Sequence, residues 1–188
     1  FGAASEEATS DGVVTGYGTI DGKLVYIYAQ DPQIFGGSVG EMHAKKIRRL
    51  YAFAVKMGAP VIGLIDCAGV RLAEATDALF AFGSLYREQA LASGVVPQIQ
   101  AVYGLCGGSL AVSAALADFT FMEKDAKLFF HAPNAISGNT EAELDTASAE
   151  FRSEESGTAD FVGTQEEIAA SIRALVGILP SSTLGVRC

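Results

Sequence analysis

Two short turns, each directly after an apolar run, contain the residues best suited to chemistry. The first runs from Asp66 to Arg71 (DCAGVR) and the second from Gly104 to Ser109 (GLCGGS). A helical pattern follows each turn, so free backbone amides are expected at helix N-termini beside the carboxyl edge of a sheet, where ligands bind in open α/β folds. Such amides stabilise a developing oxyanion, and loss of one donor raises a barrier by on the order of 3 kcal/mol. For either turn alone, the alternative is that its glycines only permit tight packing.

The cysteines and histidines are weaker candidates. Cys106, and less so Cys67, could be a thiolate activated at a helix N-terminus, but no base can be assigned by spacing, which favours small buried residues. His43 and His131 are the only histidines. We expect His43 on a helix surface or at a cap, and His131 to pack against or cap the turn that follows it.

Charged residues near the turns offer two more hypotheses. Arg71 directly follows the first turn and could orient it or pair with Glu74. The most basic stretch could attract ligand phosphates or form a solvated helix face, and it contains Lys45, Lys46, Arg48 and Arg49.

The elements that must position these residues alternate between strand and helix. A hairpin is predicted from two β-rich runs, 13–20 and 24–30, joined by Asp21-Gly22. Short apolar runs at 61–65 and 98–103 predict strands buried on both faces of a sheet. Further strands are expected at 119–122 and 128–130, and helices over about 39–57, 75–92, 109–117 and 165–179. We expect a loop at 134–139 and an acidic, weakly helical stretch at 141–155.

Bulk composition excludes several classes of function. The chain has 188 residues, 49% of them hydrophobic, which is enough for one domain with its own core. Its net charge of -9 disfavours nucleic acid and anionic membranes as partners. Three cysteines without paired short spacing favour a reducing, cytoplasmic location, and neither a signal peptide nor a membrane-spanning run is visible. Since the chain begins without Met, a fragment, a processed product and one subunit of a split protein are alternatives.

Several stretches together resemble the acyl-CoA carboxyltransferase family. They are DGVVTGYG at 11–18, QDPQIFGGSVGEMHAKKI at 30–47, and the two glycine turns. The resemblance runs in order from residue 11 to 180 and covers the first half of a family subunit without the usual N-terminal portion of that half. It predicts an N-terminal extension at 1–10, an acyl-CoA-binding domain at 11–180 and a tail at 181–188.

The resemblance implies an α/β fold of the crotonase-like ββα spiral type, with helices packed around the sheets. It also implies a transferase reaction in which a carboxyl group moves between biotin and the α-carbon of a small acyl-CoA, in a carboxylase or decarboxylase complex. Carboxybiotin would arrive on a biotin carrier protein, and a C-terminal-type half would complete the oligomer, with no metal in this chain. The absence of an obvious nucleophile–base pair fits this chemistry, because released biotin can take the α-proton.

The resemblance also implies the site residues. One backbone amide from each turn would hold the thioester enolate in an oxyanion hole: Val70, next to Gly69, and the segment from Gly107 to Ser109, with Gly108 as the expected donor. A further segment is expected to lie along coenzyme A, with Lys45 near a phosphate; it comprises Phe35, Gly36, Gly37 and Ser38. The alternative is that this segment is a plain loop before the helix.

The first turn departs from the family pattern, because many relatives have Ser-Gly-Gly-Ala-Arg where this chain has Cys67 to Arg71. Two other functions therefore stay open. One is an interaction subunit with the carboxyltransferase fold but no turnover, and the other is a biotin-independent crotonase-type enzyme.

Overall fold

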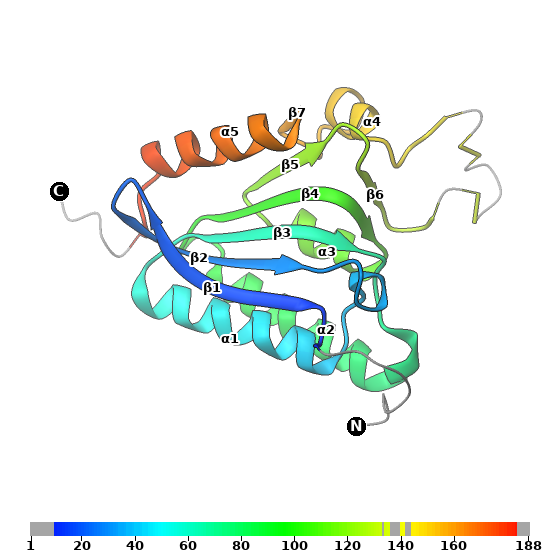
Figure 1. Ribbon diagram of the computed structural model, residues 1–188, viewed down its shortest axis with the longest axis horizontal. Coiled ribbons are helices and arrows are strands. Elements are labelled where there is room, and N and C mark those ends of the chain that lie inside the picture. Colours follow the sequence, from blue (N-terminus) through cyan, green and yellow to red (C-terminus); the bar gives the residue numbers. More distant parts are fainter. Residues whose placement is uncertain (1–9, 133, 136–139, 142–143, 184–188) are drawn as a thin grey trace.

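The computed structural model describes residues 10–132, 134–135, 140–141 and 144–183, and these form an α/β fold around one seven-stranded sheet (Figure 1). The sheet order is β1-β2-β3-β4-β5-β7, with β6 paired to β4 off this path. Only the β1–β2 pair is antiparallel within these residues. The strands are β1 (Val13–Ile20), β2 (Lys23–Gln30), β3 (Val61–Cys67), β4 (Gln98–Gly107), β5 (Phe119–Glu123), β6 (Lys127–Phe129) and β7 (Phe161–Gly163).

Helices cover both faces of this sheet. Figure 1 shows α1 and α2 along one face and α5 along the other. The buried apolar residues accordingly form two clusters, one under α1, α2 and α3 and one under α5. The helices are α1 (Glu41–Met57), α2 (Ala75–Ala92), α3 (Ser109–Ala115), α4 (Ala149–Glu154) and α5 (Gln165–Ile178), and the short 3-10 helices are η1 (Phe35–Gly37) and η2 (Leu72–Glu74).

Local sequence signals account for most of these elements. Asp21 and Gly22 both have positive φ angles, 50° and 82°, as a two-residue type I′ hairpin requires. Gly58 ends α1 in the left-handed conformation, with a φ of 64°. The predicted hairpin, the two central strands and the helix from residue 75 to 92 are thus confirmed.

Other boundaries were predicted wrongly, and tertiary pairing is the reason. Val39 does not belong to the first helix but forms a parallel bridge with Val70. β4 continues through the second glycine turn to Gly107, because its last three residues pair with β6. The acidic stretch contains only the six-residue α4, and β7 was not predicted. Most of the expected loop at 134–139 lies outside the described residues.

The last helix, α5, is held by side-chain hydrogen bonds at both of its own ends. Thr164 and Glu167 form a capping box at the start of α5. At its C-terminal end, Lys23 Nζ donates to the carbonyl oxygens of Val176, Gly177 and Leu179 at 3.0, 2.7 and 2.9 Å. A cation at this position satisfies free carbonyls and opposes the helix dipole.

We expect Lys23→Met to lower the free energy of unfolding by about 1–2 kcal/mol, because three carbonyl groups at the end of α5 lose their donor. Urea unfolding measures the change. Lys56→Met is the matched control, since Lys56 is exposed and forms no ion pair within the described residues. Equal stability of the two variants would contradict the capping role.

Candidate functional site

The two glycine turns lie against each other at the carboxyl edge of the sheet. Cys67 and Cys106, at the ends of the paired strands β3 and β4, are register partners. A Cβ atom on Gly107 would lie 2.9 Å from the Ala68 carbonyl oxygen, and one on Gly69 would lie 3.1 Å from the Gly107 carbonyl oxygen. The glycines therefore allow an approach of the two backbones that side chains would obstruct.

The first turn leaves one backbone amide free. The amide of Ala68 donates to the Gly36 carbonyl at 3.0 Å, and that of Arg71 donates to the Val39 carbonyl at 3.0 Å. The Gly69 amide donates to Cys67 Sγ at 3.2 Å. Among the described residues nothing accepts from the Val70 amide, and Val70 is only partly buried. The predicted donor of this turn is therefore available to a ligand.

The second turn differs from the prediction. The amide of Gly108 donates to the Phe129 carbonyl oxygen at 2.9 Å, so it is already engaged. Gly107 is the last residue of β4 and pairs in register with Phe129. The first residue of α3 is Ser109, whose amide has no acceptor in the described part of the chain. The free donor of this turn is thus Ser109, at its last position, and not Gly108, because Phe129 of β6 accepts from the Gly108 amide.

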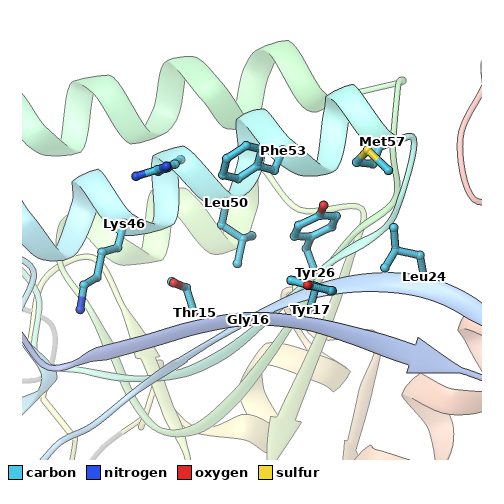
Figure 2. A pocket seen from close by; sticks show the side chains of 10 residues that line it. Thr15, Gly16, Tyr17, Leu24, Tyr26, Lys46, Leu50, Phe53 and Met57 are labelled. Carbon is cyan, nitrogen blue, oxygen red and sulfur yellow. The ribbon is translucent and has the colours of Figure 1, made fainter.

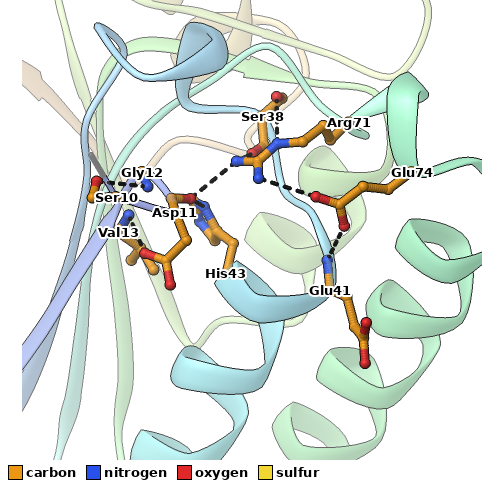
Figure 3. A network of polar contacts seen from close by, with 9 residues as sticks. All are labelled: Ser10, Asp11, Gly12, Val13, Ser38, Glu41, His43, Arg71 and Glu74. Carbon is orange, nitrogen blue, oxygen red and sulfur yellow. Dashed lines mark hydrogen bonds and ion pairs between the residues drawn. The ribbon is translucent and has the colours of Figure 1, made fainter. Parts of the chain in front are cut away.

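The side chain of Arg71 fixes the position of the first turn through contacts with three other residues (Figure 3). Its side chain is 7% exposed, and Nη2 donates to the carbonyl oxygens of Ser38 and Asp11 at 2.7 and 3.0 Å. Nη1 lies 3.2 Å from a carboxylate oxygen of Glu74, whose other oxygen accepts from the amide of Glu41 at the start of α1. The predicted Arg71–Glu74 pair is therefore present, and Arg71 acts as a positioning residue.

The predicted coenzyme A segment lies beside the first turn. Phe35, 41% exposed, lies under the Arg71 guanidinium, whose central carbon is 4.6 Å from the ring centre. Ser38 is buried and accepts from Arg71 Nε at 3.4 Å. Gly37 has a φ of 67°, and a Cβ there would collide with the Asp66 carbonyl. Close backbone packing therefore explains this glycine, and a ligand contact at the segment stays a prediction.

The basic stretch is divided, because Lys45, Arg48 and Arg49 line one hollow with Arg87 of α2, whereas Lys46 does not line it. Lys45 and Arg48 also line a small hollow between α1 and α2, with Phe80 from α2. Lys46 instead pairs with Asp11 at 2.9 Å. No residue of the glycine turns lines either hollow at Lys45, so the predicted phosphate contact of Lys45 gains no support from its position.

Neither cysteine of the turns is suited to nucleophilic attack. Cys67 and Cys106 are both buried free thiols. Burial raises the pKa of Cys67 to about 11, and it raises the pKa of Cys106 as well. A thiol with a raised pKa carries little thiolate at neutral pH. The predicted role as small buried residues is therefore confirmed for both. Cys188 lies outside the described residues.

His43 is buried, which corrects the expectation of a surface or capping role. Its Nδ1 lies 3.0 Å from the Asp11 carbonyl oxygen, and its Nε2 lies 3.1 Å from Gln30 Nε2. Since a carbonyl oxygen only accepts, Nδ1 carries the proton and Nε2 accepts from Gln30. Burial chiefly, and also the charge of Arg71, lowers the pKa of His43 to about 4. His131, in contrast, is exposed, and its ring packs edge-on against that of Phe130 with 5.0 Å between the ring centres.

In the described ranges, no cluster of three or more His, Cys, Asp or Glu side chains has a geometry that could hold a metal ion. None of the helices in this part of the chain is long and apolar enough to cross a membrane.

The chain matches the family model described as the carboxyl transferase domain over residues 1–186. It is 44% identical to the methylmalonyl-CoA decarboxylase subunit alpha of Veillonella parvula, over 98% of this chain and 37% of that protein. It is 38% identical to the biotin-dependent acetyl-/propionyl-coenzyme A carboxylase beta5 subunit of Mycobacterium leprae (strain TN), over 97% of this chain and 34% of that protein. The chain thus spans little more than a third of the length of these relatives.

Solved structures agree with these matches. The transcarboxylase 12S, a hexamer crystallised with hydrolysed methylmalonyl-coenzyme A bound, gives a TM-score of 0.86 at 36% identity, over 93% of this chain and 35% of that one. The β subunit of geranyl-CoA carboxylase from P. aeruginosa gives a TM-score of 0.81 at 26% identity, over 90% of this chain and 33% of that chain. The predicted crotonase-like α/β fold is confirmed.

We expect acidification to destabilise the protein through His43. Because its folded-state pKa of about 4 lies below the ordinary 6.5, the unfolded chain takes up the proton first as the pH falls. The contribution of neutral His43 to the free energy of unfolding is complete above pH 6.5 and is lost as the pH falls to about 4, a decrease of up to about 3 kcal/mol. Urea unfolding between pH 7 and 4 checks this, and His43→Gln should flatten the dependence. A slope unchanged in the variant would rule out His43 as its source.

We also expect Cys67 to act through its sulfur. In Cys67→Ala the buried Gly69 amide loses its acceptor, which should cost about 1–3 kcal/mol of unfolding free energy. Cys67→Ser keeps an acceptor of similar position and should cost less. Chemical denaturation of both variants measures the difference, and a serine variant no more stable than the alanine variant would speak against this role.

Proposed function

The chain belongs to the carboxyl transferase domain family, and from this membership we propose that it forms the acyl-CoA-binding part of a biotin-dependent acyl-CoA carboxyltransferase. The observation that carries the proposal is the pair of free amides, Val70 and Ser109, at two adjoining turns on the carboxyl edge of the sheet. The names of its relatives include both a decarboxylase and a carboxylase, which supports carboxyl transfer in either direction.

In this proposal the thioester carbonyl oxygen of the acyl-CoA lies against the amides of Val70 and Ser109. Removal of the α-proton moves negative charge onto that oxygen, and the two N–H groups then bind it more strongly than they bind the neutral carbonyl. The barrier falls because the donors are fixed in place beforehand. The buried neutral His43 and the high pKa of Cys67 are compatible with this role, since no side chain of the turns has to titrate.

Biotin on a carrier protein would supply the carboxyl group and take up the α-proton at its ureido group. This chain would bind and orient the acyl-CoA. Exposed apolar side chains surround the two turns and fit both an acyl chain and the surface of a covering partner: Phe35 below Arg71, Leu72 after it, Leu105 in the second turn and Phe130 next to the Gly108 acceptor. We therefore place a C-terminal-type carboxyltransferase half over this edge, within an oligomer.

The division into an extension at 1–10, a domain at 11–180 and a tail at 181–188 stays a prediction. The backbone amide of Thr183, in the predicted tail, donates to the Val95 carbonyl oxygen at 3.0 Å. The start of the tail is therefore hydrogen-bonded to the domain. The free thiols of Cys67 and Cys106 support the inferred reducing, cytoplasmic location.

Ser109→Pro tests the second donor with little change to the fold, because the first residue of a helix tolerates proline and its N–H has no partner here. In the complex with its partner subunits, we expect the variant to lower kcat by about 100- to 1,000-fold. Ser109→Ala keeps the amide and should stay close to the unchanged protein. Carboxyl transfer to or from acetyl-, propionyl- and malonyl-type CoA esters is the measurement.

The controls separate the alternatives. Gly108→Pro would not test a donor, because it would break the bond to Phe129 and force a φ of 57° toward -65°. Activity retained in an intact, correctly folded Ser109→Pro complex would refute the oxyanion role, and no turnover in any assembled variant would favour an interaction subunit. Activity that persists after biotin is sequestered with avidin would instead indicate a crotonase-type enzyme.

A further inference from the structure

A large apolar groove lies away from the glycine turns, between the β1–β2 hairpin and α1. Its volume is about 760 Å³. Figure 2 shows the side chains of Tyr17 and Tyr26 on the strand side, facing Leu50, Phe53 and Met57 of α1. Several of these side chains are solvent-exposed, with Tyr17 at 75% and Met57 at 58%. A contiguous apolar surface of this kind marks a binding site more often than a free surface.

The groove occupies the next position in the helix layer. α2 and α1 pack side by side on one face of the sheet, and α1 itself contacts β1 and β2, with the groove open beside it on the hairpin side. Tyr17 and Tyr26 are register partners, so both point to this same face. Packed helices lie about 8–10 Å apart, and a third helix beside α1 would cover the part of this face that β1 provides. No described residue of the chain fills that position.

β1 shows the same need for a partner. It is an edge strand of eight residues, VVTGYGTI, with neither a charged residue nor a proline. Edge strands that stay free in solution are usually protected by such residues. Val14, on the opposite face of the strand from Tyr17, is 71% exposed. The edge next to the groove is therefore unprotected within the described structure.

The charge at the groove selects the chemistry of its occupant. α1 carries Lys45, Lys46, Arg48, Arg49 and Lys56, five of the 13 Lys and Arg residues of a chain with net charge -9, against the single acid Glu41. Arg49 lies at the groove over the Phe53 ring, 5.4 Å from its centre, and forms no ion pair among the described residues. Lys46 also lines the groove but is paired with Asp11. A small acidic segment matches the unpaired charge of Arg49, whereas an extended anionic membrane would meet the negative remainder of the chain.

We propose that this groove docks an amphipathic helix of a partner protein. Its apolar stripe, spaced i, i+3, i+4 and i+7, lies between Tyr17 and Phe53, and its carboxylates lie along α1 at Arg49. The helix extends the α2–α1 layer over β1. This docking does not depend on the proposed carboxyl transfer, because the groove shares no residue with the glycine turns.

The test uses a fluorescently labelled helical peptide of about 18 residues with a leucine stripe and glutamates elsewhere, and a matched peptide with lysines in place of the glutamates. We expect saturable binding of the acidic peptide to the folded chain, measured by anisotropy and weakened by salt, and at least about tenfold weaker binding of the basic peptide. Arg49→Glu and Met57→Glu should each weaken binding by about tenfold or more. Phe80→Glu, at an exposed apolar position on α2 outside the groove, should leave binding unchanged.

Several results would overturn the proposal. Equal binding of the two peptides, or binding unaffected by Met57→Glu, would show that the groove does not select an acidic helix. If sedimentation reveals a self-association that Met57→Glu abolishes, while the peptide does not compete with it, the occupant is a second copy of the chain. Binding to phosphatidylserine vesicles that Arg49→Glu abolishes, without peptide binding, would assign the surface to a membrane.

Discussion

The arrangement of the first turn depends on the buried guanidinium of Arg71. Its contacts with Ser38 and with the Asp11 carbonyl join segments far apart in the sequence, and Glu74, three residues further on, forms its ion pair. A buried charge is tolerated only when it is paired and hydrogen-bonded, so these partners must stay in place together. Because the Arg71 amide also pairs with Val39, the network fixes the backbone around Val70 and leaves that amide free.

In the proposed site the backbone provides the chemistry, and side chains support it. Gly69 and Gly107 let the two turns approach, Cys67 Sγ holds the Gly69 amide, and the Phe129 carbonyl holds that of Gly108. Every such contact fixes an amide that is not itself offered to a ligand. This explains why the first turn can carry Cys67 and Val70 in place of other small residues, since the donated groups are common to all amino acids except proline.

Two open surfaces lie apart on one sheet. The carboxyl edge holds the free amides with an exposed apolar rim, and the hairpin with α1 forms an apolar groove with a basic border. Asp11 contacts residues near both surfaces. Its carbonyl oxygen accepts from His43 Nδ1 and from Arg71, and its carboxylate pairs with Lys46, which lines the groove. Asp11 therefore stands between the site and the groove.

The sequence by itself determined the hairpin, α1, α2, the central strands and the position of both glycine turns, because each follows from local periodicity, turn residues or apolar runs. It also identified Val70, whose amide stays free. Only the tertiary structure decided that Ser109 replaces Gly108 as the second free donor, because β6, about 20 residues further along, takes the Gly108 amide. The burial of His43 and the groove beside α1 were equally beyond a sequence pattern, since both arise from how separate elements pack.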